Sequence, residues 1–414
     1  MGNRRHVGRV RATAALVGAA LVAACAPASE APAGKTPFDA HRWERVADDA
    51  PWGARAGVEA VALDGSFFLV GGRTPNPFTP FPQGPIPGDS RIWGDVWRSD
   101  DLGRTWTEVL PDGDAPWPAR SYHEVVVQGD RMVLLGGQDF ALDPNPACGQ
   151  DVFCFPRFIS RSRFFNDVWA SRDGARWEQL TAAAPWSERA GLSAAVLDGV
   201  IYVLGGSQND DVSIVGGPPR RTLFNDVWRS VDGVTWERAT AAAPWAPRAG
   251  ASVVVRDGWL YLFGGEFAFT GFPPPYFNDV WRTRDGAAWE LVTSAAGWSP
   301  RPGHTCDDLD GTFLCFGGYG QSPNPLDVFG RNSPRDMWAS TDGATWTRLA
   351  TRPWDAVTEA DVRYDYDTVV APGGPATTGD AVYTFGGDRE TFNFFDETQW
   401  RNVDDDVWRF ALPD

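Results

Sequence analysis

The feature that most constrains this chain is a sequence unit that recurs six times. Each unit contains Asp-Val-Trp (once Asp-Met-Trp), a Gly-Gly pair after an apolar run, and a tryptophan shortly before an arginine. The tripeptides begin at Asp95, Asp167, Asp226, Asp279, Asp336 and Asp406. A unit repeated in this way predicts one array of equal parts rather than several unlike domains.

Each unit has the pattern of four short strands. In the fourth unit we expect strands at residues 248–255, 259–265, 278–283 and 289–292, and we call these positions a, b, c and d. Asp-Gly pairs join a to b and c to d, as in tight hairpins. A single four-stranded sheet cannot bury both of its faces, so the units must stack around an axis.

The two chain ends indicate how the array closes. The sixth unit stops after its c strand, at the C-terminus. The missing d strand is found at residues 41–46, where Trp43 matches the tryptophan that opens each other d strand. The sequence therefore predicts an all-β, six-bladed β-propeller of four-stranded antiparallel blades, in which the N-terminal strand closes the last blade.

These features resemble kelch-type β-propellers of the galactose-oxidase-like superfamily over residues 38–414. The matching features are the Gly-Gly after strand b, the aromatic residue in strand c and the tryptophan that opens strand d. Residues 99–106, Ser-Asp-Asp-Leu-Gly-Arg-Thr-Trp, also resemble the Asp-box, a turn motif of sialidase-like propellers. The resemblance assigns these motifs to the fold. We interpret the repeated tryptophans as packing between blades rather than as a carbohydrate-stacking platform.

The N-terminus has the pattern of a processed leader. Residues 1–24 combine a basic start with a short apolar run, and they end in small residues directly before Cys25. This resembles the lipobox of bacterial lipoproteins, which implies a signal peptide, cleavage and a lipid on Cys25. Residues 25–37 would then be the lipidated cysteine and a flexible tether. The alternative is an ordinary secretory signal that happens to contain a cysteine.

The charge narrows the classes of partner. The chain has a net charge of −17, and removal of the leader, with four arginines and no acid, makes the remainder about −21. Such a body repels nucleic acid and anionic headgroups. We therefore expect no nucleic-acid partner. We also expect a monomer that touches the membrane only through its lipid, in the cell envelope. In a Gram-negative host, Ala26 rather than an aspartate after Cys25 favours the outer membrane.

The long connections between strands indicate a working face. Residues 73–93, 138–165 and 388–404 all connect b to c, and these connections share one face of a propeller with the d–a connections. Binding usually occurs on long loops carried by a rigid scaffold. We predict that this face holds the ligand.

An arginine at the start of each strand a should reach the same face. Six guanidinium groups around the channel mouth could bind carboxylate or sulfate groups. Alternatively, each arginine pairs with the aspartate of its Asp-Val-Trp tripeptide, because buried charges are normally paired. The arginines are Arg55, Arg120, Arg189, Arg248, Arg301 and Arg363.

Three units depart from the repeat four residues after that arginine. Units 3 to 5 have a hydroxyl residue at this position, whereas the other three have Glu59, Glu124 and Asp367. Those units are neighbours in a closed ring, so their acids could perform general acid/base catalysis or bind a cation. The alternative is that they are solvated channel walls.

Histidine and cysteine usage limits the cofactors. A copper radical oxidase needs two histidines and two tyrosines on one metal. After the leader only His41, His123 and His304 remain, and His123 and His304 fall in units 2 and 5, on opposite sides of the ring. No sialidase-type Arg-Ile-Pro motif is present, whereas a kelch-type sialic-acid epimerase stays compatible with the sequence. We expect no transition metal and no cofactor, with calcium as the one cation that the acids could bind.

The remaining cysteines predict two disulfides, as expected after export. Cys306 and Cys315 face each other across the turn at Asp310-Gly311, and Cys148 would pair with Cys154 in the long connection of unit 2. Two pairs of free thiols are the alternative.

Two functions remain open. The first is a surface-anchored binding module that recognises a glycan or a protein through the loop-rich face. The second is a carbohydrate-active enzyme, a sialic-acid mutarotase or a lyase, that uses Glu59, Glu124 or Asp367 beside the arginine ring.

Overall fold

The computed structural model describes residues 33–76, 90–149, 151, 154, 158–209, 220–268, 275–320, 332–374, 377–390 and 401–413. The expected leader, Cys25 and most of the expected tether lie outside the described residues. Within the described part, no helix is long and apolar enough to cross a membrane. The ring described below lies within residues 33–414.

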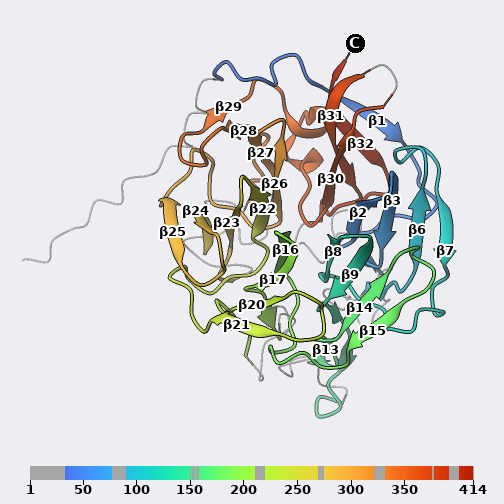
Figure 1. Ribbon diagram of the computed structural model, residues 1–414. Helices are drawn as coiled ribbons and strands as arrows, with labels where there is room; N and C mark the ends of the chain where they lie inside the picture. Colours follow the sequence, from blue (N-terminus) through green and yellow to red (C-terminus); the bar gives the residue numbers. More distant parts are fainter. Residues whose placement is uncertain are drawn as a thin grey trace, which may run out of the picture. The chain divides into compact units, whose positions relative to one another are not determined.

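Six four-stranded antiparallel sheets form a ring, and each is a blade (Figure 1). In order a to d, the blades are β2 (Glu59–Leu63), β3 (Ser66–Val70), β6 (Val96–Ser99), β7 (Thr107–Leu110); β8 (Glu124–Gln128), β9 (Arg131–Leu135), β14 (Val168–Ser171), β15 (Glu178–Thr181); β16 (Ser193–Leu197), β17 (Val200–Leu204), β20 (Val227–Ser230), β21 (Glu237–Thr240); β22 (Ser252–Arg256), β23 (Trp259–Glu266), β24 (Tyr276–Thr283), β25 (Trp289–Thr293); β26 (His304–Leu309), β27 (Thr312–Gly317), β28 (Met337–Ser340), β29 (Thr347–Arg348); and β30 (Asp367–Pro372), β31 (Thr377–Phe385), β32 (Val407–Pro413), β1 (Arg42–Ala47).

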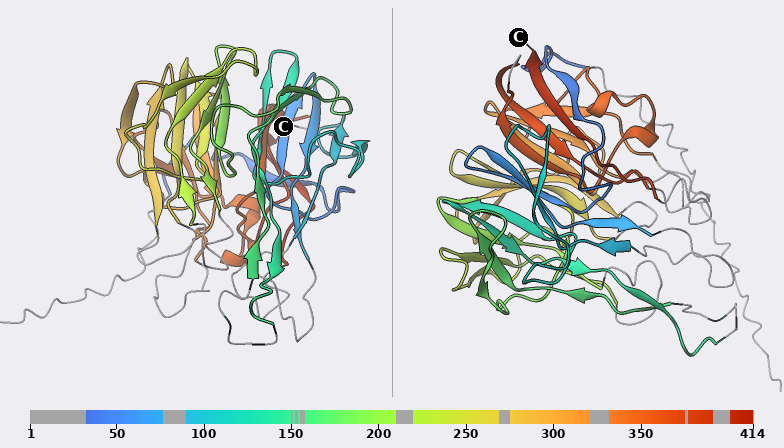
Figure 2. Two further views of the ribbon diagram at one scale, coloured as in Figure 1. Left: turned by 90° about the horizontal axis from the view of Figure 1, so that it is seen from below. Right: turned by 90° about the vertical axis from the view of Figure 1, so that its right-hand side faces the viewer.

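Short two-stranded ribbons extend several of the connections between b and c strands. The ribbons are β4 (Arg73–Pro75) with β5 (Ser90–Ile92), β10 (Gln138–Asp139) with β13 (Arg163–Phe164), β11 (Leu142–Pro144) with β12 (Phe158–Ser160), and β18 (Ser207–Gln208) with β19 (Thr222–Leu223). Two 3₁₀ turns, Pro353–Asp355 and Glu359–Asp361, precede β30. Figure 2 shows β10 and β13 projecting from one end of the ring.

The prediction that the N-terminal strand closes the ring is confirmed. β1 pairs antiparallel with β32, and Trp43 lies opposite Phe410. The indole of Trp43 packs 5.7 Å from that of Trp354, measured between ring centroids. Each other blade has an equivalent pair, at 5.7–6.2 Å and edge to face: Trp52–Trp106, Trp117–Trp177, Trp186–Trp236, Trp245–Trp289 and Trp298–Trp346. Aromatic pairs prefer such offset geometries.

The Asp-Val-Trp segment and the turn after it are fixed by side-chain hydrogen bonds to the backbone. In the third blade, the Asn225 amide donates to the carbonyls of Ala243 and Trp245, which fixes the chain before the next a strand. The Ser230 hydroxyl accepts the N–H of Gly233 at 2.8 Å, and Asp232 accepts the N–H of Thr235 at 2.7 Å. Such side-chain bonds to the backbone stabilise tight turns.

The core lies between neighbouring blades. The cluster between the first two blades, for example, joins Phe68 and Val96 of one to Trp117 and Leu134 of the next. The a strands β2, β8, β16, β22, β26 and β30 are innermost in the ring (Figure 1), and residues of all six line a central cavity. In the fourth blade, strand a begins later than we expected from the sequence. β22 begins at Ser252 rather than at Arg248, because Gly250 has a left-handed φ of 58°.

Candidate functional site

The six arginines before the a strands are internally paired, which is the second of the two alternatives that the sequence left open. Their side chains are at most 5% exposed. The Arg120 guanidinium donates to both carboxylate oxygens of Asp167, at 2.8 and 3.0 Å, and to the carbonyl of Gly136. The pairs are Arg55–Asp95, Arg120–Asp167, Arg189–Asp226, Arg248–Asp279, Arg301–Asp336 and Arg363–Asp406. Buried ions need this compensation, so the guanidinium groups serve the fold.

A closed ring of backbone hydrogen bonds surrounds the channel two residues after these arginines. Each N–H donates to the carbonyl of a neighbouring blade, at 2.9–3.4 Å. The six residues are Gly57, Tyr122, Gly191, Gly250, Gly303 and Asp365. All six have a φ between 50° and 62°, a region that favours glycine. We call them the backbone ring.

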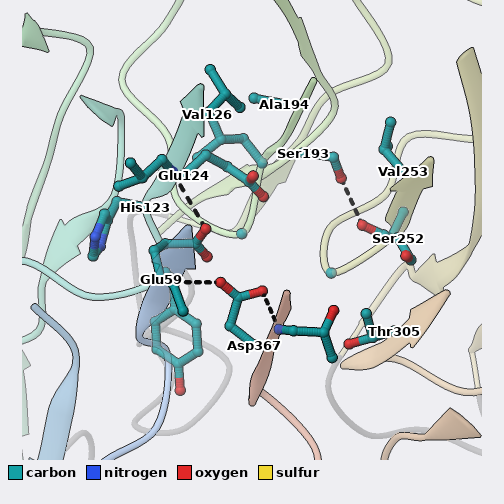
Figure 3. Close-up of a pocket in the computed structure, with 18 of the residues that line it drawn as sticks. Glu59, His123, Glu124, Val126, Ser193, Ala194, Ser252, Val253, Thr305 and Asp367 are labelled. Carbon is teal, nitrogen blue, oxygen red and sulfur yellow. Dashed lines mark hydrogen bonds between the residues drawn. The ribbon is translucent and has the colours of Figure 1, made fainter. Parts of the chain in front are cut away.

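The three acids predicted from the sequence come together beyond the backbone ring. Glu59, Glu124 and Asp367 begin the a strands of three adjacent blades and line a central cavity of about 470 Å³ (Figure 3). Glu59 Oε2 accepts the N–H of Val125 at 3.3 Å, and Asp367 Oδ2 accepts the N–H of Ala60 at 2.5 Å. We call Glu59, Glu124 and Asp367 the channel acids.

The opposite wall makes the same kind of link between blades with hydroxyl groups. Ser193 Oγ donates to the carbonyl of Ala251 at 2.7 Å, and Ser252 Oγ accepts the N–H of Cys306 at 2.9 Å. A hydroxyl therefore suffices to join neighbouring blades. A carboxylate brings, in addition, a second oxygen and a titratable proton into the channel.

Burial and mutual repulsion raise the pKa values of the channel acids. Burial raises the pKa of Glu59 well above its ordinary value, and the carboxylates of Asp367 and Glu124 raise it further. Burial and then Asp367 raise the pKa of Glu124 well above its ordinary value. Burial raises the pKa of Asp367 to about 7. Three buried carboxyl groups with raised pKa values are not all ionised near neutral pH, so the cluster contains both a protonated acid and an ionised base.

Asp307 is a fourth acid that our sequence analysis missed. Its Oδ1 accepts the Thr368 hydroxyl at 3.0 Å, and burial raises its pKa to about 7. Its Oδ2 has no hydrogen-bond partner among the described residues. The sequence contained a signal, because the equivalent position six residues after the arginine is apolar in every other unit, for example Val61 and Val126.

Two histidines in the same lining are neutral. His123 and His304 are buried, and burial lowers the pKa of each to about 3.

The described lining of the cavity contains no arginine or lysine. Within the described ranges, no three His, Cys, Asp or Glu side chains are arranged to hold a metal ion. Calcium binding stays a prediction.

Both predicted disulfides are confirmed. Cys306 and Cys315 lie directly opposite each other on β26 and β27, with their Cα atoms 4.1 Å apart. Cys148 and Cys154 are joined with a Cα–Cα distance of 5.3 Å.

No known family model matches the chain. It is 28% identical to Adagio-like protein 1 of Oryza sativa subsp. japonica over 247 residues, which is 57% of this chain and 34% of that protein. It is 24% identical to Xyloglucanase Xgh74A of Acetivibrio thermocellus over 346 residues, 76% of this chain and 35% of that enzyme. N-acetylneuraminate epimerase of Pasteurella multocida is 27% identical over 186 residues, 39% of this chain and 47% of that enzyme.

A solved structure, that of YjhT, superposes with a TM-score of 0.57 at 15% sequence identity, over 87% of this chain and 96% of that one. The chain is a six-bladed β-propeller. It spans about a third of the length of the first curated relatives that it matches. A likeness at this level of identity establishes the fold, and the chemistry has to be argued from the channel.

Proposed function

We propose that this protein binds a neutral carbohydrate in the central channel and catalyses proton transfer on it, with the channel acids as general acid and base. The observation that carries this proposal is the convergence of three carboxyl groups with raised pKa values in one cavity. A cavity of about 470 Å³ is of the size that holds small ligands. General acid/base groups work best when their pKa is near the operating pH.

Ring opening of a reducing sugar is the simplest reaction that this site supports. An ionised Asp367 takes the proton of the anomeric hydroxyl, and a protonated Glu59 gives its proton to the ring oxygen. The ring C–O bond breaks while a C=O bond forms at the anomeric carbon, and the step ends with Asp367 protonated and Glu59 ionised. Closure on the other face reverses these steps and gives the other anomer. No cofactor takes part.

Two kinds of observation support this class of ligand. Two of the matched proteins are named for reactions on carbohydrates, a xyloglucanase and an N-acetylneuraminate epimerase. The described lining offers carboxyl, hydroxyl and neutral imidazole groups but no fixed positive charge, which favours a neutral sugar over an anionic one. Membership of the kelch-type propellers, on the motifs given above, is part of this proposal.

The test is the rate at which sugar anomers interconvert. Purified protein is mixed with D-glucose, D-galactose or N-acetyl-D-mannosamine, and exchange between anomers is followed by NMR. We expect the wild type to accelerate exchange for at least one sugar and Glu59→Gln to lose about 100-fold of that rate. Glu237→Gln is the matched control, because Glu237 is exposed and pairs with Arg229. A wild type that accelerates none of them contradicts the proposal.

A surface-anchored binding module is the second candidate. It is favoured by the ribbons β4–β5, β10–β13 and β18–β19, which extend the b–c connections. The rest of these long connections lies largely outside the described residues. A glycan array and a pull-down with the full protein test this candidate. Binding that survives in Glu59→Gln and is lost when residues 77–89 are replaced by Gly-Ser supports it.

We also propose that the chain is exported and carries a lipid on Cys25. The two disulfides support export, because such bonds persist in oxidising compartments. Mass spectrometry of the protein from its host membranes tests the lipid. A diacylglyceryl adduct on Cys25 that disappears in Cys25→Ser supports it, and an unmodified Cys25 in the mature chain contradicts it.

A further inference from the structure

Two members of the backbone ring break its glycine pattern. Tyr122 and Asp365 have φ values of 53° and 50°, where the other four positions hold glycine. Residues with side chains are disfavoured in this region, and such conformations persist where function requires them. Both residues line the central cavity.

The two exceptions lie on either side of the same glycine. The N–H of Tyr122 donates to the carbonyl of Gly57, and the N–H of Gly57 donates to the carbonyl of Asp365. They therefore belong to the second and sixth blades, which flank the first. These are also the three blades that carry the channel acids, two residues further along each a strand. Two residues of extended chain rise about 7 Å, so this pair lies nearer the loop-rich face than the acids do.

Arg73 links Tyr122 to two acids, Asp388 and Glu390. Its Nε donates to the Tyr122 hydroxyl at 2.7 Å, and its Nη2 donates to Glu390 at 2.7 Å and also to Asp388. Tyr122 also lowers the pKa of Asp365, against the effect of burial, so the two side chains interact. Arg73 therefore holds the Tyr122 hydroxyl in place.

The charges of these residues indicate the chemistry of their ligand. Arg73 is already paired with Asp388 and Glu390. Burial raises the pKa of Asp365 to about 7, with Asp388 raising it further. An anion would be repelled here, whereas a carboxyl group beside a phenol can accept and donate hydrogen bonds to the hydroxyl groups of a neutral ligand.

We propose that Tyr122, held by Arg73, and Asp365 form a second subsite at the mouth of the channel, which binds hydroxyl groups of a neutral sugar beside the channel acids. In its choice of ligand this inference rests on the proposed function. Tyr122 and Asp365 make the contact with the sugar, and Arg73 is a positioning residue. The subsite selects the ligand, while the channel acids transfer protons.

The first test separates a functional role from a structural one. Glycine is the residue that the ring uses at four of its six positions, so Asp365→Gly should leave the melting temperature within about 2 °C of the wild type. The same variant should weaken sugar binding at least 10-fold. A melting temperature that falls by more than about 5 °C, with unchanged sugar affinity, would identify Asp365 as a structural residue and overturn the inference.

The second test measures affinity by calorimetric titration with the three neutral sugars named above, and with N-acetylneuraminate as an anionic comparison. We expect Tyr122→Phe and Asp365→Asn each to weaken neutral-sugar binding about 10-fold. The matched controls are Tyr202→Phe, in the third blade, and Asp257→Asn, which also has a positive φ but lies in an a–b turn. The controls should bind as the wild type does.

The outcomes distinguish this inference from the proposed function. If the mouth variants bind normally while Glu59→Gln loses turnover, the subsite is wrong and the proposed function stands. If the mouth variants lose binding while Glu59→Gln keeps full turnover, the subsite stands and the proposed catalysis is wrong. If N-acetylneuraminate alone binds, or if no sugar binds the wild type, the neutral-sugar subsite is overturned.

Discussion

The carboxylate of Asp367 accepts a hydrogen bond from the backbone N–H of Ala60, across the seam where the sixth blade meets the first. It also accepts the N–H of Thr368 at 2.7 Å. Asp367→Ala removes both acceptors and leaves buried donors unpaired, which should lower the free energy of unfolding by about 2 kcal/mol. Urea denaturation followed by tryptophan fluorescence measures this.

Glu59→Gln is the matched variant for that experiment. The glutamine carbonyl can still accept the N–H of Val125, and a neutral side chain is what burial favours at this position. We expect its stability to equal or exceed that of the wild type at pH 7.5. A loss as large as that of Asp367→Ala would mean that the ionised form of Glu59 stabilises the fold, contrary to our account.

The raised pKa values predict an unusual dependence of stability on pH. The pKa of Asp307, Asp365 and Asp367 is raised to about 7, chiefly by burial, from an ordinary value near 4. Between about pH 4 and pH 7 the folded protein therefore holds protons that the unfolded chain releases, and stability must fall as pH rises through this window. Calorimetry should show a melting temperature that decreases from pH 5 to pH 8.

Other acids set the pH below which stability is lost. Arg301 and Arg363 lower the pKa of Asp336 and Asp406, against the effect of burial, so the stability from these pairs is lost below about pH 4. The stability maximum should thus lie near pH 4–5. A melting temperature that rises steadily from pH 5 to pH 8 would show that the channel acids are ionised in the folded protein.

Breaking one of the buried arginine–aspartate pairs should destabilise the protein strongly. Asp167→Ala leaves Arg120 buried without its counterion and should destabilise the protein by about 3–5 kcal/mol. Asp130→Ala is the comparison, because it breaks an exposed pair with Arg172 and should change stability little. Chemical denaturation of both variants decides this, and equal effects would contradict the assignment of these pairs to the core.

The cross-strand disulfide should also stabilise the protein. Cys306 and Cys315 close a loop with a sequence separation of 9. Loop-closure entropy gives about 2.5–3 kcal/mol for a loop of this size. A double replacement, Cys306→Ala with Cys315→Ala, should lower the midpoint of urea unfolding accordingly. Reductant should then no longer lower the stability of this variant by breaking the 306–315 bond. An unchanged midpoint would mean that β26 and β27 hold the hairpin without it.

Much of the fold could be predicted because its determinants are local and repeated. The Gly-Gly pairs, the hairpin turns and the tryptophan that opens each d strand recur in nearly every unit, so Trp43 could be matched to the sixth blade. The neighbouring positions of Glu59, Glu124 and Asp367 also followed from ring closure. Their coupling did not, because it depends on how far each carboxyl group is buried.

Several parts of the candidate site were not predicted, although some of their residues depart visibly from the repeat. Asp307 replaces an apolar residue, and Tyr122 and Asp365 replace glycine, which a full comparison of the six units could have shown. The repeated aspartates indicated that arginines such as Arg120 are paired, but the choice between a paired and a free state depended on side-chain burial. Contacts between distant segments, such as that between Arg73 and Asp388, need the closed ring.

The central claim is that the channel acids are not all ionised near neutral pH. Carbon-13 NMR of the side-chain carboxyl groups tests it directly, with signals assigned by their loss in Glu59→Gln, Glu124→Gln and Asp367→Asn. We predict that Asp367 titrates at about pH 7, that Glu59 and Glu124 titrate well above ordinary carboxyl groups, and that each variant shifts the remaining two. Three independent titrations, all with midpoints below about pH 5, would contradict the account.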